Sequence, residues 1–447
     1  MPLHFHLDRG GLSSCQADRG TGLTNNAKNV FPIPRPAALV RMLTVTMLAL
    51  AAAVALALPA PEPVAIRHVS VVNVLNGRIQ KDVTVLLTDG AIRAIGKKIP
   101  VKNAQVLEGA GKFLIPGFWD MHVHCWSDED FFPLFLANGV TGIRDMFGQL
   151  EELKAWRTNV ESGVTLGPRM VFSGPILDGP KPVWPGSIAV GTPEEGRKAV
   201  GTIQQGGTDF VKVYSLLPRE AYFAIAEEAK KRHFVFAGHV PDVITATEAS
   251  NAGQKSFEHL LSVLSGCSSL GDGWRTNPAP GRSRMQLVRE VLASYAPAKA
   301  TALFALFRKN GTWQCPTLTV LHAMAHLDEP AFRNDPRLSY LPSDVRASWE
   351  PTNDFRFKAF SPDDWEANRL SFEKQCELVA RMANSGVKIL AGTDTPNPYA
   401  FPGFGLHDEL ALMVKCGLTP LQALQTATIN PALYFGWEKN MGTVQVG

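Results

Sequence analysis

Short apolar runs alternate with longer amphipathic stretches along most of this chain. The runs occupy residues 113–119, 139–145, 169–174, 209–214, 234–239, 256–259, 313–319 and 387–394. Each is short and ends in polar residues, which is typical of a buried strand in a parallel sheet. We therefore expect eight parallel strands, the first of which continues through residues 120–124.

The stretches between these runs show helical patterns. We expect a helix with Pro218 in its first turn, one over residues 373–383, one over 406–414, and one that begins after an N-cap at Thr419. Strands that alternate with helices favour an all-parallel sheet. Eight such repeats predict an α/β fold of the (β/α)8 TIM-barrel type.

Residues 64–115 follow a different pattern, in which short alternating segments surround the pair Asp89-Gly90. This pair is a strong signal for a hairpin turn. The pattern predicts a small antiparallel β unit before the barrel.

Chemically reactive side chains gather at the carboxyl ends of the predicted strands. His122 and His124 lie two positions apart on the first strand, so both imidazoles point to the same side. That end of a barrel strand faces the active-site mouth, and two imidazoles held this way form half of a divalent metal site. Lys212 and three further residues occupy equivalent places on later strands, namely His239, His259 and Asp394.

The order and spacing of these motifs resemble the amidohydrolase superfamily, in its two-metal branch, and especially its imidazolonepropionase-like and Xaa-Pro-dipeptidase-like group. The matching motifs are residues 116–124, 139–146, 210–214, 238–239, 258–259 and 392–394, within a likeness that runs from Val64 to the last residue. The resemblance implies a barrel over residues 116–435. It also implies a β-sandwich domain that combines residues 64–115 with a C-terminal part, of which residues 436–447 would be a truncated beginning.

The resemblance also assigns roles to the candidate residues. His122 and His124 would bind a buried divalent metal ion, together with Asp394, and His239 and His259 would bind an outer ion. Zn²⁺ is the expected metal. Lys212 would bridge the two ions after reacting with carbon dioxide to form a carbamate, because an ammonium group has no lone pair with which to bind a cation.

The implied reaction is hydrolysis of a C–N amide bond in a small substrate, a dipeptide or an N-acyl amino acid, by a metal-bridging hydroxide. Asp394 would move the proton to the leaving amine. Tyr214 lies two residues beyond Lys212 on the same side of its strand, and we expect it to hydrogen-bond the substrate. Two alternatives stay open: hydrolysis of a lactone or phosphotriester at the same site, and a non-catalytic exported binding protein.

Several neighbouring residues have expected supporting roles. We expect Glu258 and Asp120 to orient neighbouring histidines or backbone, Arg144 and Asp145 to pair with each other, and Cys125 to pack away from the metal site. Cys267 and Cys315 are a candidate disulfide pair. The segments 177–186 and 322–362 are expected to wall the pocket and to form a lid, and Trp184 is a candidate to stack on substrate.

Composition excludes several other classes of function. A net charge of +3 and the absence of a basic stripe argue against a nucleic-acid partner. The chain has no Gly-x-Ser-x-Gly motif, which argues against a serine hydrolase. The sequence leaves homo-oligomerisation open.

The N-terminal region indicates export. Residues 1–41 are polar and irregular, which suggests a disordered leader or a misassigned start, whereas residues 42–60 combine an apolar run after arginines with small residues, as in a signal peptide. We expect a periplasmic or secreted protein without a stable membrane partner after cleavage, or a membrane-anchored one if the segment is not cleaved.

Overall fold

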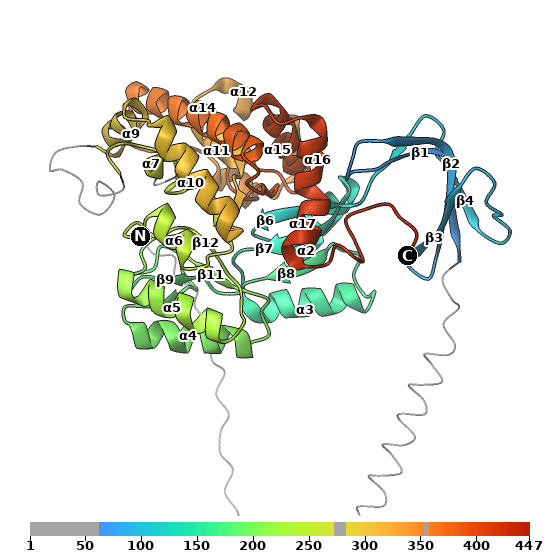
Figure 1. Ribbon diagram of the computed structural model, residues 1–447, viewed down its shortest axis with the longest axis horizontal. Coiled ribbons are helices and arrows are strands. Elements are labelled where there is room, and N and C mark those ends of the chain that lie inside the picture. Colours follow the sequence, from blue (N-terminus) through green and yellow to red (C-terminus); the bar gives the residue numbers. More distant parts are fainter. Residues whose placement is uncertain (1–61, 272–282, 353, 355) are drawn as a thin grey trace, which may run out of the picture. The chain divides into compact units, whose positions relative to one another are not determined.

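The computed structural model describes residues 62–271, 283–352, 354 and 356–447 (Figure 1). Seven of the predicted parallel strands are present as β6 (Phe118–Val123), β7 (Val140–Asp145), β8 (Arg169–Phe172), β11 (Val211–Val213), β12 (Phe236–Gly238), β13 (Ser256–Glu258) and β14 (Trp313–Cys315). Every residue of β6 is buried, which explains why this strand has no alternating pattern.

The parallel strands form two sheets instead of one continuous barrel. One contains β6, β7 and β8, and the other has the order β10-β9-β11-β12-β13-β14, with β9 (Leu177–Asp178) and β10 (Ile188–Ala189) at its edge. Between β8 and β11, the amide of Asp209 donates to the carbonyl of Phe172 and the amide of Phe172 donates to the Asp209 carboxylate, while β11 itself pairs with β9. The α/β fold with parallel sheets is confirmed, and the closed eight-stranded barrel stays a prediction.

The predicted eighth strand is not a regular strand, but its backbone joins the two sheets. The amide of Leu390 donates to the carbonyl of Gln314 in β14 (2.8 Å), and the amide of Met121 in β6 donates to the carbonyl of Ala391 (2.9 Å). An isolated parallel bridge also links Val123 and Thr395. This pairing brings the end of the segment beside the end of β6.

The predicted helices are present, with changed boundaries. α5 (Arg219–Lys231) has Pro218 as its N-cap rather than in its first turn. α14 (Pro362–Asn384) begins well before residue 373, because Ser361 and Asp364 form a capping box. α15 (Phe404–Lys415) is followed by α16 (Pro420–Ala427), whose N-cap is Thr419 as predicted.

The segment 322–362, predicted as a lid, is built from short helices rather than one loop. These are the end of α11 (Leu318–His326), then α12 (Pro330–Arg333), η1 (Pro336–Tyr340) and α13 (Ser343–Ser348). The remaining helices are α2 (Asp128–Ala137), α3 (Leu150–Glu161), α4 (Pro193–Gln205), α6 (Ala246–Asn251), α7 (Val263–Gly266), α9 (Arg284–Ala293), α10 (Pro297–Asn310) and α17 (Ile429–Phe435).

The N-terminal β unit is a mixed five-stranded sheet. β1 (Val64–Val72), β2 (Ile79–Thr88) and β3 (Ala91–Gly96) are antiparallel, and Asp89 and Gly90 both have positive φ, as the predicted hairpin turn requires. β4 (Gln105–Glu108) and β5 (Phe113–Leu114) pair with β1 in parallel, so the expectation of a purely antiparallel unit is wrong. The chain brings these strands back beside β1 instead of continuing the hairpin.

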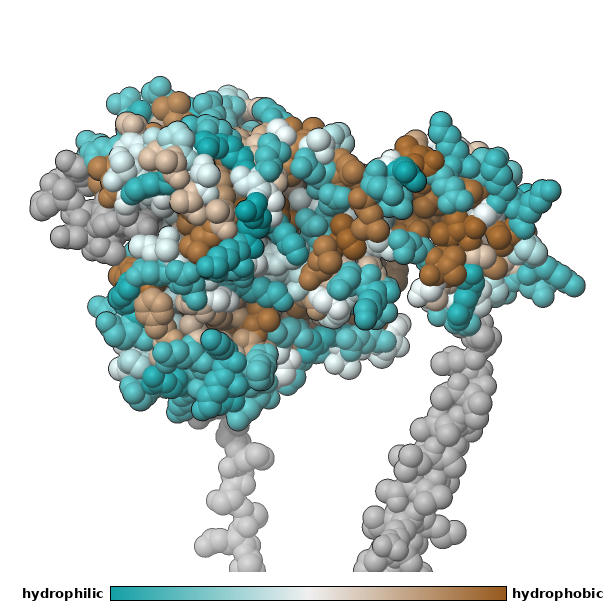
Figure 2. Space-filling view, viewed as in Figure 1, coloured by the Kyte–Doolittle hydropathy of each residue, from teal (hydrophilic) through white to brown (hydrophobic). Residues whose placement is uncertain are grey.

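Hydrophobic side chains gather over this sheet on the face shown in Figure 2. Val106 and Leu107 of β4 are each nearly half exposed. The described residues form one sheet layer here, so the β-sandwich stays a prediction.

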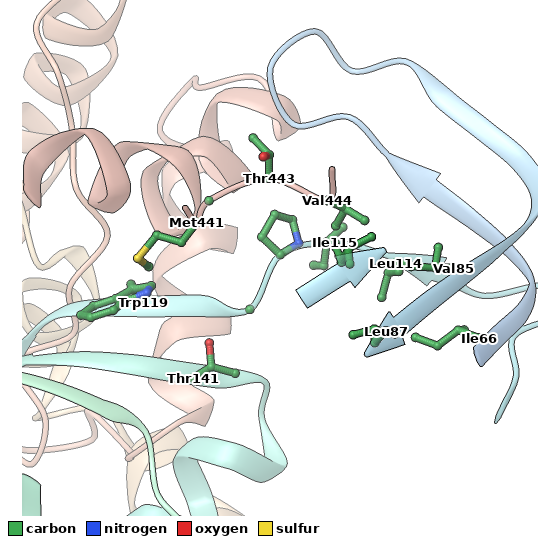
Figure 3. A pocket seen from close by; sticks show the side chains of 14 residues that line it. Ile66, Val85, Leu87, Leu114, Ile115, Trp119, Thr141, Met441, Thr443 and Val444 are labelled. Atoms are coloured by element: carbon green, nitrogen blue, oxygen red, sulfur yellow. The ribbon is translucent and has the colours of Figure 1, made fainter. Parts of the chain in front are cut away.

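A cavity of about 290 Å³ lies between this sheet and the amino end of β6 (Figure 3). Its walls include Leu87, Ile115, Trp119 and Val444. None of the predicted site residues lines it. It lies at the opposite end of β6 from the two histidines, so it is separate from the candidate site.

A buried arginine ties the centre of the fold together. Arg144 of β7 donates to both carboxylate oxygens of Glu258 (2.9 and 3.0 Å), to the carbonyl of Met121 (2.6 Å) and to the hydroxyl of Tyr434 in α17 (2.9 Å). The expected pairing of Arg144 with Asp145 is therefore wrong. Neighbouring residues on a strand point to opposite faces, and the Asp145 carboxylate accepts backbone amides instead.

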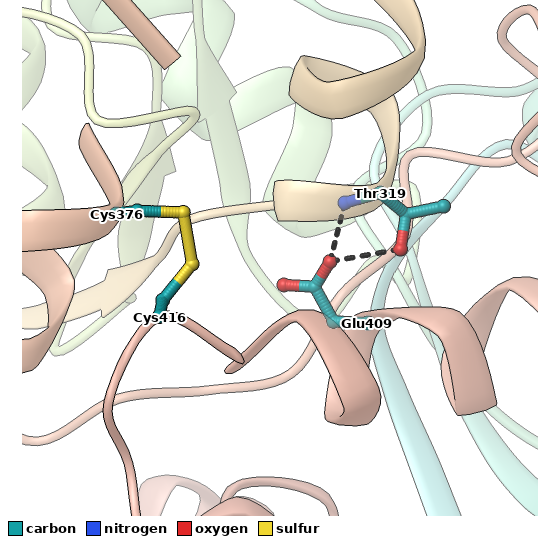
Figure 4. Close-up of a disulfide and its surroundings, with 4 residues drawn as sticks. All are labelled: Thr319, Cys376, Glu409 and Cys416. Carbon is teal, nitrogen blue, oxygen red and sulfur yellow. Dashed lines mark hydrogen bonds between the residues drawn. A yellow bond between two sulfur atoms is a disulfide. The ribbon is translucent and has the colours of Figure 1, made fainter. Parts of the chain in front are cut away.

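The disulfide also differs from expectation. Cys376 of α14 is bonded to Cys416 at the end of α15 (Figure 4). Cys267 and Cys315 are both buried and are not bonded to each other, since Cys315 lies within strand β14 and packs in the interior.

The predicted leader and signal peptide lie outside the described residues. Within the described residues, no helix combines the length and apolar character needed to span a bilayer.

Replacing Arg144 by Met should lower the free energy of unfolding by about 3–5 kcal/mol, because it leaves the Glu258 carboxylate buried without its partner. Chemical denaturation measures this loss. The surface substitution Lys154→Met removes an exposed ion pair with Glu151 and should cost less than about 1 kcal/mol. Equal stabilities of the two variants would contradict the assigned role.

Reducing the Cys376–Cys416 bond should lower the free energy of unfolding by about 2–4 kcal/mol, since the bond closes a loop with a sequence separation of 40. Denaturation with and without reductant measures the change. The double variant Cys376→Ser/Cys416→Ser serves as the control and should not respond to reductant. Identical midpoints for the oxidised and reduced wild-type protein would refute the expectation.

Candidate active site

Three of the predicted ligands converge where β6 meets the segment that follows Ile389. Asp394 Oδ1 lies 3.0 Å from Nε2 of His124 and 3.3 Å from Nε2 of His122. The potential ligand atoms of these three residues all lie within 4.8 Å of one another. Two imidazoles and a carboxylate at this spacing form a donor set suited to a divalent cation.

The second nitrogen of His122 is held by Glu258, as expected. Its Nδ1 lies 2.8 Å from Glu258 Oε2, and both side chains are fully buried. A carboxylate can only accept, so Nδ1 carries the proton and Nε2 is left with a lone pair facing Asp394. This is the arrangement by which proteins orient metal-binding histidines.

His239 and His259 lie next to this group. Their ring centres are 4.9 Å apart, and the ring of His259 lies 4.6 Å from that of His122. Nδ1 of His239 hydrogen-bonds with Ser215 (2.9 Å) and Nδ1 of His259 with Thr317 (2.7 Å). In His259, Nε2 is therefore the nitrogen that can face a ligand.

Lys212 lies beside the same cluster, with Nζ 3.5 Å from Nε2 of His122. Burial lowers the pKa of this lysine to about 8. Its uncharged amine is therefore accessible near neutral pH, and only that form can react with carbon dioxide.

Electrostatics keep the remaining groups in matching protonation states. Burial lowers the pKa of His122 well below its usual value and that of His259 to about 4, so both imidazoles are neutral. Burial opposes ionisation of Asp394, but interactions with His259 and His124 outweigh it and lower the pKa of this carboxyl. The ionised carboxylate of Asp394 therefore faces the neutral imidazoles of His122 and His259.

Asp120 supports the site as a hydrogen-bond acceptor, as expected. Its carboxylate accepts the backbone amide of His122 (3.2 Å) and both the amide and the hydroxyl of Thr393 (3.0 and 2.7 Å). Asp120 thus joins the strand that carries His122 to the segment that carries Asp394.

Close approach and unusual backbone conformations shape this rim. A Cβ on Gly392 would lie 2.8 Å from Cβ of His122, and one on Gly238 would lie 2.8 Å from Cδ of Lys212. His259 and Asp394 both have positive φ, 61° and 62°. Such conformations are uncommon for residues other than glycine and persist only where the surroundings enforce them.

Tyr214 lies beside the site, and its hydrogen bond to a substrate stays a prediction. Its ring stacks on that of His239, with centres 3.9 Å apart, and its hydroxyl accepts a hydrogen bond from Trp184 Nε1 (2.7 Å). Trp184 therefore contacts Tyr214, and its stacking on a substrate stays a prediction. The Tyr214 hydroxyl keeps its own proton for donation, because burial raises its pKa to about 12.

Sequence reasoning missed several supporting residues. Arg144, Ser215 and Thr317 hold site residues, and Cys315 lies within ligand distance of His122 and Glu258. Burial raises the pKa of the Cys315 thiol. The signal available in the sequence was position, because Ser215 and Thr317 each lie two residues beyond the end of a parallel strand.

Among solved structures, similar folds include bottromycin amidohydrolase (23% identity, TM-score 0.67, covering 84% of this chain and 78% of that one) and a putative prolidase from Bifidobacterium longum (24% identity, TM-score 0.64, covering 87% of each chain). A Xaa-Pro dipeptidase with bound methionine is also similar (17% identity, TM-score 0.61, 86% of this chain and 91% of that one).

Curated relatives include ochratoxinase of Aspergillus niger, 24% identical over 430 residues, which cover 81% of this chain and 74% of that protein. The N-acetylglucosamine-6-phosphate deacetylase of Lysinibacillus sphaericus is 46% identical, but only over 65 residues, 14% of this chain and 16% of that protein. The model of the amidohydrolase family matches residues 113–447. This chain therefore belongs to the amidohydrolase family of hydrolases, whose members typically bind divalent metal ions.

Proposed function

We propose that this protein is a metal-dependent hydrolase that cleaves a C–N amide bond in a small substrate, a dipeptide or an N-acyl amino acid. The observation that carries the proposal is the convergence of His122, His124 and Asp394, with ligand atoms within 4.8 Å of one another. Similarity to structures described as a prolidase, a Xaa-Pro dipeptidase and an ochratoxinase supports an amide substrate.

The donor set fits two divalent ions, with Zn²⁺ as the expected species because imidazole and carboxylate ligands suit it. His122, His124 and Asp394 would hold one ion, and His239 and His259 the other. When bound, two such ions lower the pKa of water and polarise a carbonyl group.

The outer pair needs a further ligand, since His239 and His259 are not part of any three-ligand group among the described residues. Lys212, whose Nζ lies beside His122, is suited to supply one, because a carbamate on Nζ would carry two oxygens and a negative charge. Its burial and lowered pKa support this modification.

The chain's own residues account for the proton transfer. Asp394 has an ionised carboxylate at the centre of the cluster and would take a proton from the attacking water and deliver it to the leaving amine. Tyr214 would donate its hydroxyl proton to a substrate oxygen while Trp184 fixes the direction of that hydroxyl. Glu258 would keep His122 oriented throughout.

The same proposal extends to architecture and location. The bridging segment 388–395 supports a closed (β/α)8 barrel, and the exposed apolar side chains of the N-terminal sheet support a β-sandwich. Export to the periplasm or beyond is supported by the Cys376–Cys416 bond, because disulfides persist in oxidising compartments.

A library of dipeptides and N-acyl amino acids, assayed beside lactones and phosphotriesters, tests the proposed reaction. We expect hydrolysis of amides, loss of turnover after treatment with a chelator, and recovery on addition of Zn²⁺. Asp394→Asn should lower kcat by about 10²–10⁴-fold. The matched substitution Asp328→Asn, in a surface ion pair, should leave kcat unchanged.

Three outcomes of this screen would count against the proposal. Turnover that survives complete metal removal would exclude metal-dependent chemistry. Preference for a lactone or phosphotriester would replace the amide substrate with one of the alternatives. A metal-loaded protein inert towards the whole panel would favour the non-catalytic binding protein.

Lys212→Ala should lose activity, and a short carboxylate such as propionate should restore part of it by standing in for the carbamate oxygens. Labelling with ¹³C-bicarbonate should give a carbamate carbon signal in the wild-type protein that is absent from the variant. The same carboxylate should not activate the wild type or rescue Asp394→Asn. A metal-loaded, active wild type without that signal would rule out the modification.

A further inference from the structure

The chain between α13 and α14 packs against the loop that follows Asp394. Trp349, which is buried, donates from Nε1 to the carbonyl of Pro396 (2.8 Å), and its ring contacts those of Tyr399 and Phe401. A second contact comes from Arg356, whose Nη1 donates to the side-chain oxygen of Asn397 (3.2 Å).

Asn397 connects Arg356 to the candidate catalytic carboxylate. Both its backbone amide and its side-chain amide donate to the carbonyl of Asp394, each at 3.0 Å. With the oxygen of the side-chain amide bonded to Arg356, its nitrogen is directed at Asp394. The orientation of the Asn397 side-chain amide therefore depends on the Arg356 guanidinium.

Arg356 is itself held in place by Asp354. The guanidinium donates from Nε to both oxygens of this carboxylate (3.0 Å each) and from Nη2 to Oδ2 (2.6 Å). The Asp354 side chain is only 7% exposed. A forked pair of this kind fixes the plane of the guanidinium, and lysine could not reproduce it.

Asp394 needs such support. Its φ of 62° lies in the left-handed region, which is unfavourable for a residue with a Cβ. Asn397 hydrogen-bonds the carbonyl of Asp394, and the side chain of Asp394 must face His122 and His124. A small rotation of this peptide would move the carboxylate away from both imidazoles.

The same region contains a second Asp-x-Arg pair with a different target. The Asp335 carboxylate accepts hydrogen bonds from the backbone amide, Nε and Nη2 of Arg337 in the same way. The Nη1 of Arg337, however, donates to Asp408 on α15 (2.6 Å). This pair matches the first in chemistry, and its guanidinium stacks on the ring of Phe401 (4.6 Å) and bonds Asp408 instead of Asn397, so it serves as a matched control.

We propose that Arg356 is a positioning residue for Asp394: held by Asp354, it orients the Asn397 amide, which maintains the Asp394 backbone in the conformation that aims its carboxylate at the two histidines. This inference rests on the proposed hydrolase function only for its effect on turnover. Its effect on the Asp394 loop is independent of that function.

The test compares Arg356→Ala with Arg337→Ala in the full-length protein. Hydrogen exchange should become faster over residues 393–399 in Arg356→Ala and stay as in the wild type in Arg337→Ala. With the preferred amide substrate and equal metal loading, Arg356→Ala should lower kcat by about 10- to 100-fold with little change in KM. Arg337→Ala should leave kcat unchanged, whatever its effect on the melting temperature.

Two further variants keep the proposal testable. Asn397→Ala should reproduce the loss of kcat, and Arg356→Lys should recover part of it, because an ammonium can still donate to Asn397 but cannot form the fork with Asp354. Unchanged exchange over residues 393–399 in Arg356→Ala would overturn the proposal. So would a rise in KM at constant kcat, which would make Arg356 a substrate-binding residue. If the wild type hydrolyses no amide, the hydrolase function fails, and the exchange comparison still decides this inference.

Discussion

The buried ion pair between Arg144 and Glu258 is the constraint on which the rest of this structure depends. Both side chains are removed from water, so each charge is tolerable only while the other is present. The guanidinium also reaches the backbone of β6 and the hydroxyl of Tyr434, and so links strands and a helix distant in sequence. Because Glu258 in turn orients His122, the same pair that organises the interior also sets the direction of the first predicted ligand.

The rim of the candidate site is built from conformations that a polypeptide does not adopt without support. His259 and Asp394 have left-handed backbones, and Gly392 occupies a place where a side chain would collide with His122. Packing and hydrogen bonds from several segments hold these positions. Among them, Asp120 accepts the backbone amide of Thr393, and Asn397 donates to the carbonyl of Asp394. The site is thus preorganised by the surrounding fold, which is how strained residues persist at functional positions.

Much of the α/β part could be predicted because its signals are local. The apolar runs that became β6, β7 and β13, and the N-cap at Thr419, depend on residues adjacent in sequence. The eighth run failed to form a regular strand, although its backbone bonds join the two sheets. The N-terminal unit is a mixed sheet because β4 and β5 pair in parallel with β1. This pairing joins segments that are distant in the sequence, so local patterns do not predict it.

The sequence by itself determined which side chains stand at the strand ends, and with them the family and the identity of His122, His124, Lys212 and Asp394 as candidates, since strand periodicity and motif order are written along the chain. Only the tertiary structure decided their partners. Arg144 pairs with Glu258 and not with its neighbour Asp145, Cys376 bonds Cys416, and Arg356 reaches Asn397. The reason is physical: hydrogen bonds and ion pairs act over a few ångströms in space, and separation along the sequence does not reveal which distant groups folding brings that close.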